Sequence, residues 1–286
     1  MALNFEDIVG HPALNAAVQA QARAMQQAYE GNPRASSVFA TQQRWLMAHI
    51  GLALHFRRDY YRKELTAARF VDVTVQHAVA SRNTAHAFIK EMRHYDFIEV
   101  GPMADDGRIR PLHLPAITLE PLIGWIHMHL STLDALDGGS RLETFQARPQ
   151  MLARLQPLIA DGLISSVPVM REPQQTFSLF TWLNNGGVVM DWLIAGVDPQ
   201  NAGQERIPTG VLSIGDFSRR LKLSRTHLAR KLRDAEVLGS VGWLGQRGHS
   251  VMWISKEFYG EYLTAQAVKL AIIDSAFAAC MEQATG

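Results

Sequence analysis

The side chains best suited to chemistry in this sequence are arginines and lysines gathered on short segments. Between Arg219 and Arg233 lie seven basic residues and no acidic one, although the chain of 286 residues has a formal net charge of only +1. Local clustering of this kind, rather than the overall charge, lets a protein neutralise the phosphates of a nucleic acid. The pattern therefore indicates a surface that binds a polyanion.

Two segments, which start at Ser81 and Ser224, place these charges on helices with one apolar face. The residues expected to face inward are Ala85, Ile89 and Met92 in the first helix, and Leu228, Leu232 and Ala235 in the second. The residues expected to contact DNA are Ser81, Arg82, Asn83, Thr84, His86, Lys90 and Arg93 in the first helix, and Ser224, Arg225, Thr226, His227, Arg230, Lys231 and Arg233 in the second. Serine suits the N-cap of a helix, and arginine and asparagine match guanine and adenine edges.

A strand, a turn and a second strand are expected after each of these helices. Over 97–115 the dipeptide Asp106-Gly107 predicts a hairpin turn, and over 239–255 the turn holds Gly245 and Gly248. A basic hairpin tip beside such a helix typically reaches backbone phosphate or the minor groove. The tip residues expected to do so are Arg108 and Arg110 in the first hairpin, and Gln246, Arg247 and His249 in the second.

The two segments belong to a repeat with an offset of 143 residues, which places Ser81-Arg82 on Ser224-Arg225. The order of helices, hairpin and long helix recurs in both halves, which indicates two copies of a domain. The predicted fold is mainly α with small β-hairpin wings, as tandem winged helix-turn-helix domains. Residues 1–139 hold an N-terminal helix and the first domain, and residues 140–286 hold the second domain and a long C-terminal helix. Segment 197–210 is expected to be a loop, because it is rich in Pro, Gly and Asn.

The first copy resembles the recognition helix and wing of MarR-type winged-helix transcription regulators. The matching residues are Ser81, Arg82, Thr84, Asp105, Asp106, Arg108 and Leu112. The family's glycine before the first wing strand is replaced by Asp96, whereas the second copy keeps it as Gly239 and lacks the Asp-Asp wing. The resemblance implies DNA binding. Family members carry one winged helix per subunit and dimerise, so their dimer geometry does not transfer simply to a chain with two.

The remaining composition favours a cytoplasmic protein without a cofactor. Cys280 is the single cysteine, so no intrachain disulfide or cysteine-rich zinc site can form. The N-terminus does not look like a signal peptide, and no run of 18 apolar residues predicts a membrane span. His127 and His129 point to different sides of a helix, so no metal site is expected. No phosphate-binding loop, dinucleotide fingerprint or nucleophile elbow is present, so enzyme activity is not expected.

The sequence therefore predicts a DNA-binding transcription regulator whose partner is double-stranded DNA. The two copies would act as a pseudo-dimer on a two-part site, or the chain would form a homodimer through residues 12–30 and 256–283. A protein-interaction module on degenerate winged helices is one alternative, and a small-molecule sensor is another. One aromatic stretch is expected in the core or at a domain interface, with a pocket for a small effector molecule as the alternative. It comprises Phe177, Phe180, Trp182 and Trp192, with Trp125 and Met128.

Overall fold

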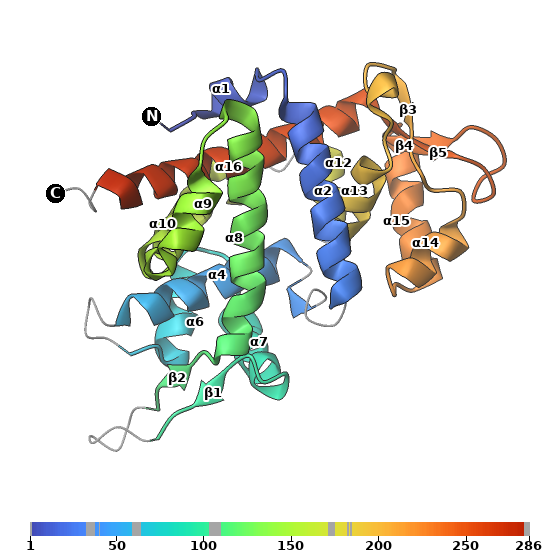
Figure 1. Ribbon diagram of the computed structural model, residues 1–286. Helices are drawn as coiled ribbons and strands as arrows, with labels where there is room; N and C mark the ends of the chain where they lie inside the picture. The colour runs from blue at the N-terminus through green and yellow to red at the C-terminus, as the bar shows by residue number, and fades with distance from the viewer. Residues whose placement is uncertain are drawn as a thin grey trace.

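Helices form most of the structure, and the strands are confined to two small antiparallel sheets (Figure 1). The computed structural model describes residues 2–32, 38–39, 41–58, 64–102, 110–170, 175–181, 183 and 185–282. The predicted mainly helical class with small hairpins is confirmed.

The first half consists of two N-terminal helices and a helical unit that carries a hairpin. Its elements are α1 (Phe5–Val9), α2 (Leu14–Gly31), α4 (Gln42–Phe56), α6 (Ala67–Gln76), α7 (Arg82–His94), β1 (Glu99–Val100), β2 (Leu112–His113) and α8 (Ala116–Asp137). β1 and β2 are antiparallel, with Val100 opposite Leu112. The backbone N–H of Leu112 also donates to the carbonyl of Leu65 (2.7 Å), so the chain that enters α6 lies against the hairpin.

The second half repeats this order after a set of linking helices. The linking helices are α9 (Arg141–Ala147), α10 (Leu152–Ser165), α11 (Val167–Met170) and α12 (Gln175–Thr181). The repeated unit comprises α13 (Gly186–Ala195), β3 (Arg206–Pro208), α14 (Ile214–Arg220), α15 (Arg225–Val237), β4 (Val241–Trp243), β5 (Met252–Ser255) and α16 (Lys256–Glu282). In its sheet β5 lies between β3 and β4, and both neighbours are antiparallel to it.

The prediction that residues 197–210 form only a loop is wrong, because β3 lies within this segment. Ile207 is fully buried and pairs with Ile254, while Arg206 lies over the Trp253 ring at 4.9 Å. A three-residue strand that ends in Pro208 is too short to leave an alternating pattern in the sequence. Proline is tolerated there because β3 is at the edge of the sheet.

The turn between the paired helices has the same backbone geometry in both halves. The matching bonds run from Val79 N to Thr74 O (3.0 Å) between α6 and α7, and from Leu223 N to Ser218 O (2.9 Å) between α14 and α15. The residue before each donor has a positive φ, 54° at Ala78 and 50° at Lys222. A serine then caps the second helix in each half. The repeat is therefore present in the backbone, with one extra residue in the first turn.

The ends of α7 and α15 also match, at an offset of 143 residues. Each helix closes on a left-handed residue, Asp96 with φ 59° and Gly239 with φ 72°. The closing bonds run from Phe97 N to Met92 O (2.9 Å) and from Ser240 N to Ala235 O (3.0 Å). Left-handed backbone favours glycine, and an L-residue with a Cβ adopts it at a cost. Asp96 therefore carries a strain that Gly239 avoids.

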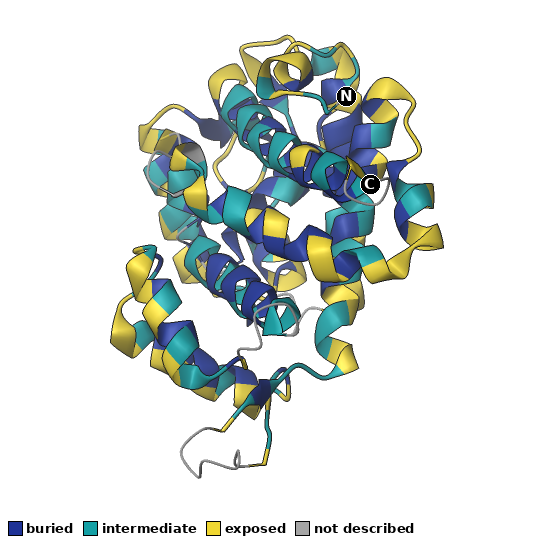
Figure 2. Cartoon of the chain, turned by 90° about the vertical axis from the view of Figure 1, so that its left-hand side faces the viewer, coloured by how far each residue is buried: buried dark blue, intermediate teal, exposed yellow. Residues whose placement is uncertain are grey.

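The two halves share one continuous set of buried apolar side chains. Helix α2 from the first half packs on α13 and α8, and α10 packs on α4. The last helix, α16, crosses the molecule from β5 and contacts α12, α2, α8, α1 and α10 (Figure 1). Figure 2 shows the buried residues on the sides of these helices that meet, and the exposed residues on the outer turns.

A buried arginine joins the linking helices to α16. Arg141 donates to both oxygens of Asp137 (2.7 Å each) and to Asp274 on α16 (2.6 Å), and it also contacts Asp134 (3.3 Å). The backbone N–H of Leu3 completes the shell of Asp274 at 2.8 Å. The hydrogen bond from Arg141 holds the pKa of Asp137 below its usual value. Breaking such a cluster on one side would leave an unpaired buried charge, so it fixes the position of α16.

Among the described helices, α16 is the one long and apolar enough by composition to cross a membrane. The core helix of a globular protein meets the same criteria. Leu270 and Ile273 of α16 are fully buried inside the chain.

The backbone strain at Asp96 predicts the effect of a single substitution. Asp96→Gly should raise the free energy of unfolding by about 0.5–1 kcal/mol, because glycine adopts a positive φ without steric cost. Gly239→Ala is the matched change in the other half, and it should lower stability by about 1 kcal/mol. Urea unfolding at neutral pH measures both. A lower or unchanged midpoint for Asp96→Gly would contradict this assignment.

Candidate functional site

Helix α15 separates an apolar face from a basic one. Leu228, Leu232 and Ala235 are fully buried against the rest of the unit, as predicted. Thr226, Arg230 and Arg233 are exposed. At 100° per residue these three lie within one sector on the opposite side of the helix. Burial of the apolar stripe therefore fixes which side chains the helix presents to solvent.

Ser224 positions the start of α15. Its hydroxyl accepts a hydrogen bond from the backbone N–H of His227 (3.5 Å), as expected of an N-cap. The side chains of Ser224, Arg225, Thr226 and His227 are all exposed. The helix N-terminus, with its unpaired backbone N–H groups, therefore lies at the surface beside Arg225.

Most basic residues of this segment are not neutralised within the protein. Arg219 pairs with Asp216, and Lys231 with Asp234 at 3.7 Å. Over the residues that the structure describes, the others of the seven form no ion pair; these are Arg220, Lys222, Arg225, Arg230 and Arg233. All five are exposed. They give α15 and the turn before it an uncompensated positive surface.

The structure places Arg247 against α15 and not free at the hairpin tip. Its guanidinium donates to both carboxylate oxygens of Glu236 (2.8 and 3.0 Å). The Trp243 indole N–H donates to the same carboxylate at 2.9 Å. Glu236 thus ties the hairpin to the end of α15, and Arg247 would have to leave this partner to reach phosphate. The sequence did not indicate the pair, because only the folded hairpin brings these residues together.

Helix α7 has the same apolar face but a less basic outer one. Ala85, Ile89 and Met92 are buried as predicted, together with Phe88. The exposed polar residues of α7 are Arg82, Asn83, His86, Lys90, Arg93 and also His94, which was not predicted from the sequence.

Some polar groups at the start of α7 already have partners. Arg82 pairs with Asp72 at 3.0 Å, although both side chains stay well exposed. The Ser81 hydroxyl accepts from the backbone N–H of Thr84 (3.2 Å) and lies 2.9 Å from the Thr84 hydroxyl. Lys90 and Arg93 form no ion pair with any residue that the structure describes. Among the described residues, α7 therefore offers fewer free cations than α15.

The tip of the first hairpin falls outside the described residues, and with it Arg108, Asp105 and Asp106. Arg110, at the near end of the tip, is exposed.

The predicted residues form two separate surfaces. In Figure 1, α7 lies beside α6 and the first hairpin, whereas α15 lies beside α14 on another side of the molecule. Each helix is next to its own hairpin.

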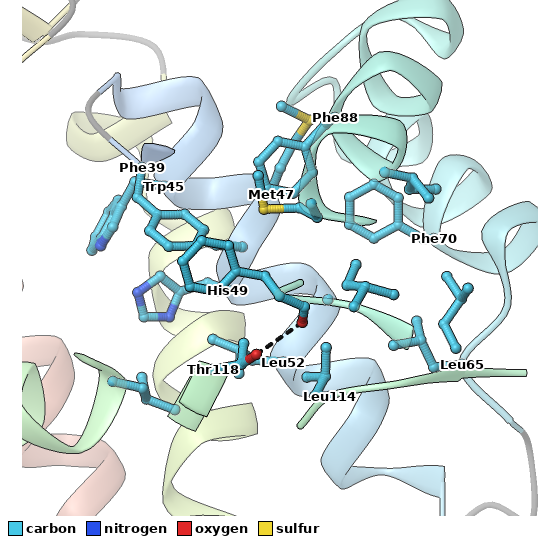
Figure 3. A pocket seen from close by; sticks show the side chains of 18 of the residues that line it. Phe39, Trp45, Met47, His49, Leu52, Leu65, Phe70, Phe88, Leu114 and Thr118 are labelled. Atoms are coloured by element: carbon cyan, nitrogen blue, oxygen red, sulfur yellow. Dashed lines mark hydrogen bonds between the residues drawn. The ribbon is translucent and has the colours of Figure 1, made fainter. Parts of the chain in front are cut away.

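A cavity of about 190 Å³ lies inside the first unit, behind α7. Its walls come from α4, α6, α7, the hairpin and α8, and most of its lining side chains are apolar (Figure 3). An apolar cavity of about 150 Å³ is large enough to hold benzene. Of the aromatic residues predicted for the core or a domain interface, Trp125 of α8 lines this cavity, whereas Phe177, Phe180 and Trp192 do not. Trp182 lies outside the described residues.

Several polar side chains are buried where the two halves meet. His49 of α4 and His129 of α8 are buried, and burial together with the nearby Lys269 of α16 lowers the pKa of both; that of His49 falls to about 3. Burial raises the pKa of Asp191 to about 6 and lowers that of Lys269 to about 8. The Tyr262 hydroxyl donates to Asp191 at 2.6 Å. Because the pKa values of His49 and His129 lie well below the usual value of histidine, both histidines are neutral near pH 7.

Among the residues that the structure describes, no group of three or more His, Cys, Asp or Glu could hold a metal ion. No protein-family model, curated protein or solved structure matches this chain.

The environment of Asp191 predicts a pH dependence of stability. The folded-state pKa lies above the unfolded value of 3.8, so the neutral acid stabilises the fold fully below that value and this contribution is lost as pH rises through about 6. Asp191→Asn removes the titration and keeps an acceptor for Tyr262. The stability of the wild type relative to this variant should fall by about 1 kcal/mol between pH 5 and pH 7.5.

Urea unfolding at the two pH values measures this difference. Glu99→Gln, at an exposed carboxylate on β1, is the control and should follow the wild type at both. Equal pH dependence in wild type and Asp191→Asn would show that Asp191 does not titrate as its burial requires.

Proposed function

We propose that this chain is a sequence-specific DNA-binding transcription regulator with two winged helix-turn-helix units. The observation that carries the proposal is the outer face of α15. Its exposed arginines have no carboxylate partner among the described residues, and they lie opposite a fully buried apolar stripe. A helix that reads DNA needs this division, because its inner face must be held rigidly while its outer face enters the major groove.

The elements around α15 fit that role. Helix α14 and the tight turn at Lys222 support the start of α15, and the β4–β5 hairpin follows its end. Arg220, Lys222 and Arg225 are exposed at and just before the first residue of the helix, where backbone N–H groups and positive charge together favour phosphate. Arg230 and Arg233 lie further along the same helix, where side chains reach base edges or the opposite backbone.

Helix α7 is proposed as the second DNA-contacting helix, with a different balance of contacts. Asn83 and Lys90 are exposed on its outer face, and asparagine is suited to adenine edges. With fewer free cations, α7 would add sequence discrimination more than affinity. Two units in one chain would then read a two-part site without a second subunit.

The packing of the terminal helices favours this tandem arrangement over a homodimer. Residues of α2 and α16 such as Val18, Ala22 and Leu270 are fully buried within the chain. Their apolar surface is therefore already used by contacts with α13, α8 and α10.

Removing two arginines from α15 should weaken DNA binding strongly. Arg230→Ala with Arg233→Ala should raise the Kd for a labelled random-sequence 30-base-pair duplex by about 30-fold or more, because each arginine contributes about 1 kcal/mol or more. Fluorescence anisotropy at fixed salt measures the change. The control removes the same charge elsewhere, through Arg148→Ala with Arg154→Ala, both exposed and remote from α15.

The control variant should bind DNA with a Kd within about twofold of the wild type, because its charges lie outside the proposed contact. Equal loss in both double variants would mean that general charge, and not the α15 face, holds the duplex. If the wild type does not bind DNA, the proposal is wrong and the protein-interaction alternative remains.

The contribution of α7 is tested by sequence selection. Asn83→Ala with Lys90→Ala should leave binding to the random pool within about fivefold, because phosphate contacts from α15 remain. The DNA sequences that the variant selects from that pool should show no base preference at one half of the two-part site, whereas those selected by the wild type should show a preference at both halves. Identical enriched sequences for wild type and variant would show that α7 does not read bases.

A further inference from the structure

The turn before α15 is held by a side chain from the other half of the chain. Tyr29 of α2 is buried, and its hydroxyl donates to the carbonyl of Leu221, the C-cap residue of α14, at 2.5 Å. The last carbonyls of a helix have no partner within that helix. A buried carbonyl without a partner is unfavourable, so Tyr29 supplies a bond that α14 cannot supply by itself.

A side chain at the start of α13 joins this contact. The side-chain amide of Asn185 donates to the Tyr29 hydroxyl at 3.4 Å and to the Leu221 carbonyl at 3.5 Å. Asn185 is the N-cap residue of α13 and has left-handed backbone, with φ 59°. The end of α14, the start of α13 and helix α2 therefore meet at one buried polar point.

This polar point adjoins the proposed DNA-binding surface. Lys222, whose φ is 50°, follows Leu221 directly, and Ser224 caps α15. A shift of the Leu221 carbonyl would move the start of α15, because only Lys222, Leu223 and Ser224 lie between Leu221 and the first residue of the helix. The hydrogen bond from Tyr29 therefore acts on the position of α15 although Tyr29 itself is buried.

The corresponding turn of the first unit is held from within that unit. The side-chain amide of Gln43, on α4, donates to the carbonyl of Val79 in the turn before α7 at 2.9 Å. Helix α4 and helix α7 belong to the same unit. The carbonyl in the second turn is instead bound by α2, which precedes the first unit in the chain, so this contact ties one half to the other.

Helix α2 connects the second turn to the first unit. It packs on both α8 and α13 and lies between them in Figure 1. The start of α8 is fixed to the end of α7, because the Thr118 hydroxyl donates to the carbonyl of Phe97 at 2.8 Å, the dashed line in Figure 3. Phe97 directly follows the left-handed Asp96 that ends α7. A continuous set of contacts thus runs from the end of α7 through α8 and α2 to the start of α15.

We propose that Tyr29 is a positioning residue that anchors the turn before α15 to the first half of the chain. It thereby fixes α15 relative to α7, and with it the spacing between the two parts of the DNA site that the chain accepts. Spacing matters because each added base pair moves one part of the site along and around the duplex. The role in spacing rests on the proposed function, whereas the anchoring of the turn does not.

Hydrogen exchange of the full chain without DNA, followed by mass spectrometry, tests the anchoring. In Tyr29→Phe the backbone amides of residues 221–225 should exchange faster than in the wild type by about fivefold or more, because the turn loses its bond to α2. The amides of α7 in the same sample should change by less than about twofold, because their own turn is held by Gln43.

Tyr262→Phe is the matched control for the exchange measurement. Tyr262 is equally buried, and its hydroxyl bond to Asp191 at 2.6 Å joins α16 to α13 without involving the turn. This variant should leave exchange of residues 221–225 within about twofold of the wild type. Unchanged exchange in Tyr29→Phe, or equal acceleration in both variants, would overturn the anchoring.

The role in spacing is tested by anisotropy with the two-part site that the wild type selects from a random pool. One base pair inserted between the parts should raise the Kd of the wild type by about tenfold or more, because it turns one part by about a tenth of a helical turn. The same insertion should raise the Kd of Tyr29→Phe by about threefold or less, because α15 is then less firmly held. A duplex with only one part should bind both proteins with Kd values within about threefold, because Tyr29 does not contact DNA.

A purely structural loss would weaken binding to both spacings by the same factor. An equal rise in Kd for the wild type and Tyr29→Phe, no rise in the wild type, or the same tolerance in Tyr262→Phe would therefore contradict the role in spacing. If the wild type does not bind DNA, the proposed function fails, and the exchange measurement alone decides whether Tyr29 anchors the turn. If Tyr29→Phe does not fold, Asn185→Gly takes its place, because it removes the other donor to Leu221 and glycine adopts the positive φ freely.

Discussion

Burial of α16 between the two halves is the packing on which the rest of the structure depends. The helix continues directly from β5, so its position also fixes the sheet and hairpin of the second unit. Leu270 and Ile273 are fully buried, and Arg141 ties Asp274 to the linking helices. On another turn, Gln266 accepts a hydrogen bond from Gln21 of α2. These contacts join the two units through one continuous core, on which both α7 and α15 pack.

The two units share a backbone plan but present different surfaces. In both units a tight turn and a serine cap precede the exposed helix, which is α7 in the first and α15 in the second, and a residue with left-handed backbone follows it. Arg225, Arg230 and Arg233 of α15 form no ion pair with any described residue, whereas Arg82 of α7 has a carboxylate partner. The cavity lies behind α7 and is lined by its inner face. The proposed division, with α15 supplying affinity and α7 supplying discrimination, follows from the difference in their exposed charges.

The features that the sequence predicted are those that depend on neighbours along the chain. The apolar stripe through Leu228 and Leu232, and the caps at Ser81 and Ser224, repeat every three or four residues or act across one turn, so their pattern is visible locally. The Arg247–Glu236 pair and the cavity depend on segments that only folding brings together. The same holds for the raised pKa of Asp191, because its cause is burial among segments that only folding brings together.

The central claim is that α15 meets duplex DNA through cations that the protein leaves free. Its most direct measurement is the slope of log Kd against log salt concentration for the wild type and for Arg230→Ala with Arg233→Ala. Each phosphate contact contributes a slope of about 0.9, so loss of two contacts should reduce the slope by close to two. Equal slopes for the two proteins would contradict the account, because the arginines of α15 would then not be the residues that displace counterions from DNA.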